Sequence, residues 1–343
     1  MSPASAPGND HTLGDDDVAK LGRLREAYSR LQTELGRVII GQSETIERLS
    51  ICLFARGHAL LVGVPGLAKT LLVSRLAEAV SLKFSRIQFT PDLMPMDITG
   101  TDILQESGGR REFLFVPGPV FANIVLADEI NRAPPKTQAA MLEAMQEQKV
   151  TVVGKTSRLE PPFFVLATQN PVEQEGTYPL PEAQLDRFMF LIEVDYPSEE
   201  EEVLIARTTT GDTLPPLDHV LTAAEIIDFQ HLVRRVPVPD HIYSFATRLV
   251  RRTRPQGATA PDWLKPLVAW GAGPRAVQNL ILGAKARAAL TGGYMVRLED
   301  VAAVAAPVLT HRVLTTFAAQ AEGLDARRIV ERLVGEALAA QNG

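Results

Sequence analysis

The chain has 343 residues, which is long for a single domain core and favours two domains. Hydrophobic residues make up 45% of it, as in chains that fold into globular domains, and 35 Lys and Arg stand against 41 Asp and Glu, for a formal net charge of −6. This balance excludes a generally basic surface and disfavours a protein whose main partner is nucleic acid.

The N-terminal segment 1–17 contains four aspartates but no Lys or Arg, which is the opposite of a secretory signal. We expect it to be a solvated, disordered acidic tail. From Val18 to Leu35, leucines and a tyrosine recur at spacings of three and four residues, which predicts an amphipathic helix. A second helix is expected to end near Ala55.

Short apolar runs then alternate with helical segments. The runs that predict buried strands are 59–62, 84–89, 123–127, 162–167 and 188–192. The segments 70–80 and 135–146 predict helices between them. This alternation is typical of a parallel sheet with crossover helices, so the predicted fold class is α/β.

The pattern becomes helical beyond Pro197, which blocks continuation of the last strand, and two Ser/Thr-x-x-Glu capping boxes open periodic segments there. We therefore expect an α/β domain at 18–196, which includes the N-terminal helix, and a small all-helical domain at 197–343. Trp263 and Trp270 flank apolar residues of the second domain, and we expect them to lie in its core.

A phosphate-binding loop is predicted between the first strand and the helix after it. The segment reads Gly63-Val64-Pro65-Gly66-Leu67-Ala68-Lys69-Thr70 and matches the pattern at every fixed position except Ala68, where glycine is usual. Its backbone N–H groups would cradle phosphate oxygens, Lys69 would reach the outer phosphates and the Thr70 hydroxyl would bind Mg²⁺. Alanine costs little at this position if its backbone is in the right-handed region.

Two adjacent carboxylates, Asp128 and Glu129, follow the apolar run 124–127. Ligands bind at the carboxyl edge of the sheet in α/β folds, so we expect both side chains at the ligand. Asp128 would hold Mg²⁺ through water, and Glu129 would polarise an attacking water.

An amide and an arginine follow the next two strands. Asn170, after the run 162–167, is the candidate for orienting the water near the terminal phosphate, although an Asn-Pro turn alone would also explain it. Arg187 precedes the last strand and is a candidate for stabilising transition-state charge. The alternative is a surface salt bridge with Asp186 or Glu182.

A second arginine, Arg275, lies in the first turn of a helix that Pro274 begins. The helix dipole disfavours a cation there, which favours an interaction of Arg275 with an anion such as a γ-phosphate. A solvent-facing arginine tolerated at small cost is the alternative.

Taken in this order, these elements resemble an AAA+ ATPase, a P-loop NTPase with a parallel-sheet core followed by a helical lid. Two segments resemble sequences of the MoxR family: the phosphate loop, and the segment 127–136, which reads Ala-Asp-Glu-Ile-Asn-Arg-Ala-Pro-Pro-Lys. The resemblance extends from about Arg37 to the C-terminal helices. In that family alanine is usual before the loop lysine, which implies that Ala68 is a family trait.

The resemblance implies a role for each residue of the α/β domain. Gly63–Thr70 would be Walker A, with ATP as the ligand. Asp128 and Glu129 would be Walker B, and Asn170 would be sensor 1. Ile40, Gly41 and Gln42 would contribute to the adenine pocket.

The same resemblance implies roles for the two arginines. Arg187 would be an arginine finger that acts on the nucleotide of a neighbouring subunit. Arg275 would be sensor 2, although Gly273 stands where the family commonly has serine, which weakens helix capping.

The segment 99–121 resembles an insert of this clade and predicts a hairpin that turns at Gly108-Gly109. A second hairpin is predicted at 150–158, with a turn at Gly154-Lys155, and resembles the pre-sensor hairpin. The sequence leaves open whether both face a ring pore or are ordinary surface hairpins.

The resemblance implies a homo-oligomeric ring, expected to be a hexamer, that hydrolyses Mg-ATP to remodel, assemble or activate protein clients. It also implies a partner with a von Willebrand A domain. The alternatives are a nucleic-acid motor of the same clade, which would use basic hairpin residues such as Lys155 and Arg158, and a magnesium-chelatase-like motor subunit. A non-hydrolysing scaffold is disfavoured because Glu129, Asn170 and Arg187 are all present.

The single cysteine, Cys52, allows neither an internal disulfide nor a cysteine zinc site, and a cytoplasmic location is expected. The longest uncharged stretch, 113–127, contains two prolines and is too short for a membrane helix, so no membrane span is expected. The six histidines show no metal-ligand spacing, and no Gly-x-Ser-x-Gly motif is present, which excludes metallohydrolase and serine hydrolase chemistry.

Overall fold

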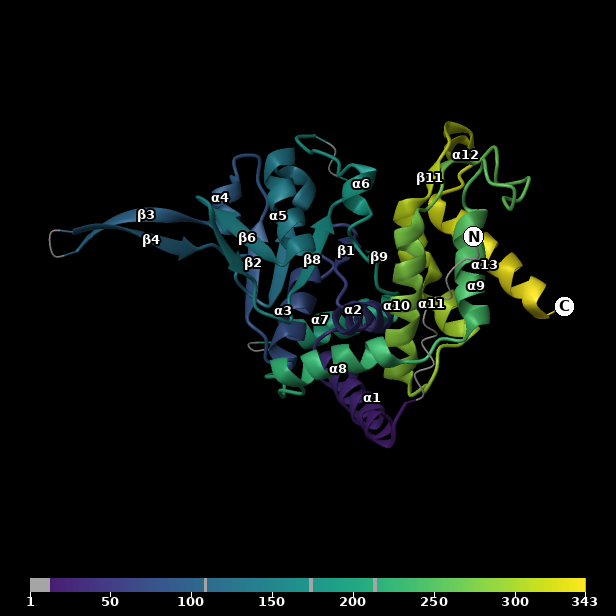
Figure 1. The fold of residues 1–343 in the computed structure, drawn as a ribbon, viewed down its shortest axis with the longest axis horizontal. Coiled ribbons are helices and arrows are strands. Elements are labelled where there is room, and N and C mark those ends of the chain that lie inside the picture. Colours follow the sequence, from purple (N-terminus) through teal and green to yellow (C-terminus); the bar gives the residue numbers. More distant parts are fainter. Residues whose placement is uncertain (1–12, 108–109, 173–174, 212–214, 343) are drawn as a thin grey trace, which may run out of the picture. The chain divides into compact units, whose positions relative to one another are not determined.

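The computed structural model of the chain describes residues 13–107, 110–172, 175–211 and 215–342 (Figure 1). Residues 1–12 of the expected acidic tail and the expected turn at Gly108-Gly109 lie outside these ranges. The described part divides into two compact units. Ser29–Ile227 holds the main sheet, and the residues before Ser29 and after Ile227 form the other unit.

A five-stranded parallel sheet lies at the centre of the first unit and confirms the predicted fold class. Its strands, in spatial order, are β2 (Phe84–Gln88), β5 (Ile124–Asp128), β8 (Phe164–Gln169), β1 (Ala59–Val62) and β9 (Phe190–Glu193). The first and last residues of each strand differ by at most two positions from those predicted, because a sheet covered on both faces requires continuous apolar runs. Every residue of β5 is buried.

Parallel pairing brings the carboxyl ends of the strands to one edge of this sheet. Val62 of β1 is in register with Gln169 of β8, and Gln88 of β2 is in register with Asp128 of β5. The loop after β1 and the polar residues that end β2, β5 and β8 therefore meet at the edge where parallel α/β sheets bind ligands.

Helices precede, connect and follow these strands. They are α2 (Ser43–Ala55), α3 (Lys69–Ala79), α4 (Pro95–Thr99), α5 (Pro135–Glu147), α6 (Glu182–Leu185) and α7 (Glu199–Thr209), with a 3₁₀ turn at Ile130–Arg132. α2, α3 and α5 each turn an apolar face inward: Leu49, Leu72 and Met141 are fully buried. This burial, more than helix propensity, stabilises helices of 11 to 13 residues.

A buried, uncharged histidine makes hydrogen bonds to two separate segments in the core of this unit. His58, next to β1, is buried, and its Nδ1 accepts a hydrogen bond from the backbone N–H of Val165 over 3.0 Å. Its Nε2 must therefore carry the proton and donate to the carbonyl of Met145, 3.1 Å away. Burial lowers the pKa of His58 to about 4, so the ring is uncharged at neutral pH.

The unit that holds the sheet extends beyond the boundary expected after residue 196. The backbone N–H of Val220 donates to the carbonyl of Ala79 at the end of α3 over 2.7 Å, and the Glu201 carboxylate of α7 lies against Gly41. Pro197 thus ends the strand pattern without ending the compact unit. The compact unit ends at Ile227, whereas the α/β domain was expected to end at residue 196.

Two antiparallel hairpins belong to the same unit. β3 (Gly100–Ser107) and β4 (Arg110–Pro117) form a ribbon that projects from the body of the unit in Figure 1. β6 (Lys149–Val152) pairs with β7 (Lys155–Arg158). The second hairpin turns at Val153-Gly154, where both φ values are positive, one residue earlier than predicted.

The other unit is mainly helical. Its elements are α9 (Asp240–Arg252), α10 (Pro274–Thr291), α11 (Leu298–Leu309), α12 (Phe317–Ala321), α13 (Ala326–Asn342), a 3₁₀ turn at Thr310–Arg312 and a short antiparallel pair, β10 (Val268–Trp270) with β11 (Leu314–Thr315). The points where the chain passes from one unit to the other lie within α1 (Asp15–Gly36) and α8 (Ala223–Arg235). No helix in the described ranges is long and apolar enough to cross a membrane.

Helix α1 begins at Asp15, three residues before the predicted start at Val18. Its first turn is acidic, which the helix dipole favours. Asp17 also accepts two hydrogen bonds from the Arg235 guanidinium, at 2.7 and 3.1 Å, and these bonds lower the pKa of its carboxyl. Residues 15–17 are therefore helical, which corrects the expectation of a disordered tail up to residue 17.

The expectation that both tryptophans lie in the helical core is wrong for Trp270, which is 70% exposed. The register between β10 and β11 shifts between Val268 and Trp270, which ends the regular alternation of buried and exposed side chains. Trp263 is half-buried, and the Arg332 guanidinium lies 3.8 Å from the centre of its ring. Such a cation–π contact suits an aromatic residue at a surface rather than in a core.

Candidate active site

The predicted phosphate loop joins β1 to α3. Gly63 fits against the backbone of Val194, because a Cβ there would lie 2.7 Å from the Val194 carbonyl oxygen. The loop then opens α3 at Lys69, whose Nζ donates hydrogen bonds to the carbonyls of Gly63 (2.6 Å) and Val64 (2.8 Å). Lys69 therefore lies folded over its own loop, at the start of a helix whose first N–H groups no side chain caps.

Ala68 has left-handed backbone angles, with φ of 54° and ψ of 22°. The condition under which alanine would cost little, a right-handed backbone, is therefore not met. A non-glycine residue in this region costs about 1–2 kcal/mol. The loop therefore keeps the backbone shape that usually demands glycine and tolerates the strain of a methyl group.

Asp128 ends β5 and is buried. Its Oδ1 accepts a hydrogen bond of 2.6 Å from the Thr168 hydroxyl of β8. Its Oδ2 accepts two hydrogen bonds from the Arg86 guanidinium of β2, one of 2.9 Å from Nε and one of 2.6 Å from Nη2. Both oxygens of this carboxylate are thus engaged by side chains of the neighbouring strands.

Glu129 follows in a left-handed conformation with φ of 56°. Its backbone N–H donates to the Thr168 hydroxyl over 2.8 Å. Its Oε2 accepts hydrogen bonds from Gln88 Nε2 (2.8 Å) and Arg132 Nη1 (3.1 Å). The positive φ turns this side chain away from the direction in which the strand would have placed it.

These groups line one cavity of about 450 Å³. Its walls are the phosphate loop at 65–71 together with Arg86, Asp128–Glu129 and the end of β8 at 168–170. Asn170 is buried at this edge, and its Oδ1 accepts a backbone hydrogen bond from Val172 over 3.1 Å. The structure therefore brings the loop, both carboxylates and the amide together as the sequence predicts.

The electrostatics of this cavity are balanced, with Lys69 and Arg86 against Asp128 and Glu129. Burial lowers the pKa of Lys69, and the two carboxylates oppose this shift. An ammonium held among backbone carbonyls and carboxylates stays positioned for an anionic group that enters the cavity.

The segment predicted for the adenine pocket adjoins the phosphate loop without lining this cavity. Gln42 donates from Nε2 to the Leu67 carbonyl over 3.0 Å. Among the described residues, its Oε1 is buried and has no hydrogen-bond partner. Gly41 has a φ of 75°, and Ile40 is half-buried. A buried acceptor beside the loop is free to receive a ligand N–H group.

The two arginines do not line the cavity. Arg187 follows α6 and is half-buried, and no ion pair with Asp186 or Glu182 is found in the described part of the chain. Arg275 belongs to the other compact unit, where it is the second residue of α10 and is exposed.

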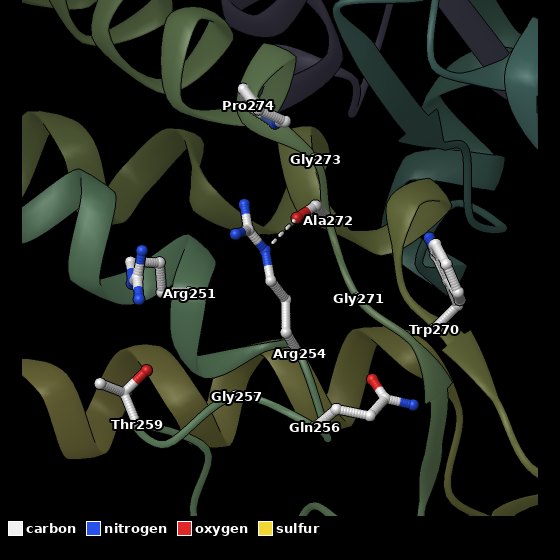
Figure 2. Close-up of a pocket in the computed structure, with 10 residues that line it drawn as sticks. All are labelled: Arg251, Arg254, Gln256, Gly257, Thr259, Trp270, Gly271, Ala272, Gly273 and Pro274. Atoms are coloured by element: carbon white, nitrogen blue, oxygen red, sulfur yellow. Dashed lines mark hydrogen bonds between the residues drawn. The ribbon is translucent and has the colours of Figure 1, made fainter.

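A cavity of about 460 Å³ lies in the helical unit, just before α10 (Figure 2). The backbone of Ala272 is held there from two sides. Arg254 Nε donates to its carbonyl over 2.9 Å, and its N–H donates to the Thr253 hydroxyl over 2.9 Å. These bonds fix the approach of the chain to Arg275.

Sequence reasoning missed four residues of the carboxylate network: Arg86, Gln88, Arg132 and Thr168. Arg86 and Gln88 occupy alternate positions of β2, so both side chains lie on the same face of that strand. Polar residues at alternate positions in a strand otherwise counted as an apolar run were the available signal for this face.

Comparison with known proteins agrees with this geometry. Residues 58–190 match the model of the ATPase family associated with various cellular activities (AAA), and residues 263–333 match an AAA lid domain. The chain is 44% identical over 302 residues to the protein named Chaperone MoxR1 of Mycobacterium tuberculosis, covering 88% of this chain and 79% of that protein.

The matches to two further relatives cover most of this chain and most of each relative. The chain is 42% identical over 312 residues to YeaC of Bacillus subtilis, covering 91% of this chain and 94% of YeaC. It is 32% identical over 321 residues to MoxR of Methylorubrum extorquens, covering 88% and 92%. A crystal structure of a candidate ATPase from Cytophaga hutchinsonii superposes with a TM-score of 0.86 at 41% identity, covering 92% of this chain and 96% of that one.

Proposed function

Because this chain belongs to the MoxR family of AAA+ ATPases, we propose that it binds Mg-ATP in the 450 Å³ cavity and hydrolyses it there. The observation that carries this proposal is the convergence of Lys69, Asp128, Glu129 and Asn170 on one edge of the sheet. These residues come from three separate segments, and their types suit phosphoryl transfer to water.

The residues of the cavity fit a triphosphate with Mg²⁺. The uncapped N-terminus of α3 offers N–H donors to phosphate oxygens, and Lys69 adds a cation. Thr70 and Asp128, the latter through water, would hold Mg²⁺, which neutralises phosphate charge when bound. The buried Oε1 of Gln42 would accept from the adenine amino group.

Glu129 is the candidate base. Its carboxylate lines the cavity and can accept a proton from water, while Asn170 would orient that water. Gln88 and Arg132 position Glu129 through its Oε2, which leaves Oε1 for the water. Thr168 fixes both acidic residues at once, by donating to Asp128 and accepting from the backbone of Glu129.

We place the two arginines outside this cavity in intersubunit and lid roles. Arg187 would act as a finger on the nucleotide of a neighbouring copy in a homo-oligomeric ring, for which six subunits is our working number. Its lack of an ion pair among the described residues supports a partner in another chain. The helical unit would act as a lid that carries Arg275 as sensor 2.

We propose that hydrolysis drives the remodelling, assembly or activation of protein clients in the cytoplasm, with a von Willebrand A domain protein as partner. The name Chaperone MoxR1 of one relative supports the protein-client assignment. The buried single cysteine, Cys52, suits a reducing compartment.

A mixing experiment tests the ring and the site together. Arg187→Ala should bind ATP but hydrolyse it on the order of 10³-fold more slowly or worse, and Lys69→Ala should not bind it. Random assembly of the two in equal amounts should restore about a quarter of wild-type turnover, because each active interface needs one intact loop and one intact finger. Arg158→Ala, an exposed arginine on β7, is the control and should keep full activity.

Two results would contradict this proposal. If the mixture stays inactive although native mass measurement shows mixed rings, Arg187 does not act in trans. If wild-type protein does not bind ATP at all, the cavity is not a nucleotide site.

A further inference from the structure

Arg86 binds one of the two carboxylate oxygens of Asp128, Oδ2, in the structure. Its Nε and Nη2 both donate to Oδ2, at 2.9 and 2.6 Å, and Nη2 also donates to Gln88 Oε1 at 2.5 Å. The Thr168 hydroxyl takes the other oxygen of the same carboxylate. Asp128 therefore has a full set of side-chain partners before any ligand is considered.

The burial of Asp128 makes a counter-charge necessary. Its side chain is 10% exposed, and a carboxylate that deep is strongly disfavoured without a partner cation. Within the cavity lining, Arg86 is the cation that pairs with it, since Lys69 donates to the carbonyls of Gly63 and Val64. A divalent cation that is bound by Asp128, directly or through water, needs the same lone pairs that Arg86 occupies.

We propose that Arg86 is a counter-ion of Asp128 and releases this carboxylate when Mg²⁺ binds with the nucleotide. Arg86 thereby suppresses binding of Mg²⁺ alone and makes the two ligands bind together. This inference rests on the proposed Mg-ATP site and goes beyond it, because it assigns to a β2 residue the control of the order and coupling of ligand binding.

The position of Arg86 allows this exchange. Its side chain is 48% exposed, although the carboxylate it binds is buried. β2 is an edge strand of the sheet, and Arg86 lines the cavity. Gln88, in hydrogen-bond contact with the guanidinium, stays as an acceptor after release. A long, half-exposed side chain can rotate without moving the backbone.

The charges of the cavity lining favour coupled binding of Mg²⁺ and the nucleotide. The cavity lining holds two cations and two anions, so it is neutral as it stands. A triphosphate alone adds negative charge that a released Arg86 would help to offset, whereas Mg²⁺ alone would have to displace Arg86 with no anion to receive it. With both ligands present, Mg²⁺ would take the place of Arg86 at Asp128 and the released Arg86 would face the phosphate oxygens.

Arg86→Gln removes the counter-ion and keeps a polar side chain. The variant should bind Mg²⁺ alone more tightly, by about tenfold or more, because the Asp128 carboxylate is left without its guanidinium. It should bind ADP without Mg²⁺ about tenfold more weakly, because a cation is lost from the cavity. Because coupling between two ligands is reciprocal, the ratio of ADP affinities with and without Mg²⁺ should fall about tenfold below wild type, since Mg²⁺ no longer needs the nucleotide to receive Arg86.

The experiment is calorimetric titration of the full chain with MgCl₂ alone, with ADP in EDTA, and with ADP at saturating Mg²⁺. ADP is used so that no turnover enters the readout. Arg37→Gln is the matched control: Arg37 is 43% exposed and pairs with the less exposed Glu34 at 2.7 Å. This control should keep wild-type values in all three titrations.

Arg86→Lys covers the case in which Arg86→Gln does not fold. Lysine keeps the charge but cannot donate two bonds in the fixed geometry of a guanidinium, so its Mg²⁺ affinity should lie between those of wild type and Arg86→Gln. Circular dichroism with and without Mg²⁺ adds a second readout. Recovery of the native spectrum of Arg86→Gln by Mg²⁺ alone would support the counter-ion role.

Wild-type values for Arg86→Gln in all three titrations would overturn this inference and leave the proposed function intact. If Arg86→Gln is unfolded under every condition, wild-type values for Arg86→Lys would overturn it in the same way. Absence of ADP binding to the wild-type protein would instead contradict the proposed function itself.

Discussion

The side-chain amide of Gln88 donates a hydrogen bond to the Glu129 carboxylate over 2.8 Å. Gln88 ends β2, and Glu129 comes directly after β5, which pairs with β2. Arg132 reaches the same oxygen at 3.1 Å. Gln88 and Arg132 therefore hold the same oxygen of the proposed base, Oε2, and its other oxygen stays available for water.

Glu129→Gln should bind ATP with near wild-type affinity and hydrolyse it about 10²- to 10⁴-fold more slowly, because the amide keeps the shape but cannot accept the proton. Calorimetry and single-turnover hydrolysis measure the two effects separately. Glu143→Gln, an exposed position on α5, should change neither. Normal turnover of Glu129→Gln would mean that another group activates the water.

Lys69→Ala should lose nucleotide affinity by at least about tenfold, since it removes a cation that the loop presents to charged phosphate oxygens. Titration with ATP and Mg²⁺ measures the loss. Lys136→Ala on α5 removes an exposed lysine from the same unit and should bind normally. Wild-type affinity of Lys69→Ala would mean that Gly63–Thr70 is an ordinary turn and not a phosphate-binding loop.

His58 should make the unit that holds the sheet less stable in acid. Its pKa is about 4 in the folded chain and about 6.5 when unfolded, so the unfolded state binds a proton that the folded state does not. The stabilisation is complete above pH 6.5 and falls as the pH drops toward 4, by about 3 kcal/mol in all.

Urea unfolding followed by circular dichroism at pH 7 and pH 5 measures this loss. His58→Asn should be less stable at pH 7 and should lose the part of the pH dependence that His58 causes. His219→Asn, at an exposed histidine of the same unit, should keep the wild-type dependence. An unchanged slope in His58→Asn would show that other groups cause the acid sensitivity.

Ala68→Gly should leave the stability unchanged or raise it by up to about 1 kcal/mol. Relief of the left-handed strain, about 1–2 kcal/mol, offsets the greater freedom of glycine in the unfolded chain. Ala139→Gly, at an exposed position inside α5, should cost about 1 kcal/mol. Equal losses in the two variants would contradict the left-handed geometry of Ala68.

Gly271→Ala should destabilise the helical unit by about 1–3 kcal/mol, because its Cβ would lie 2.3 Å from the Thr253 carbonyl oxygen. Gly273→Ala, two residues on, meets nothing within 4 Å at a φ of −85° and should be tolerated. Thermal unfolding compares the two. Similar melting temperatures for both variants would show that the loop before Arg275 adapts freely.

The sequence was informative wherever one chemical property decides structure. Continuous apolar runs predicted all five strands of the sheet, because a parallel sheet buries both faces. The fixed spacing of the phosphate loop and the carboxylates at the end of β5 predicted which residues share a cavity. Both predictions depend on local patterns and on the rule that parallel strands end at one edge.

Three features depend on packing that no local pattern records. The pairing of Arg86 with Asp128 requires the adjacency of β2 and β5, which are far apart in sequence. The exposure of Trp270 follows from a register shift in a two-stranded pair. The left-handed backbone of Ala68 follows from the shape of the whole loop, and an alanine gives no sign of it in sequence.

The β3–β4 ribbon has the geometry of a lever. Eight residues per strand, at about 3.3 Å each, give it a length of about 26 Å. Its apolar side chains are exposed on both faces; Ile103 and Leu114 lie on one, and Leu104 and Phe113 on the other. A rotation of about 10° at its base would move its end by about 4.5 Å, so a small change in the body of the unit becomes a displacement larger than the rise of about 3.3 Å per residue in an extended strand.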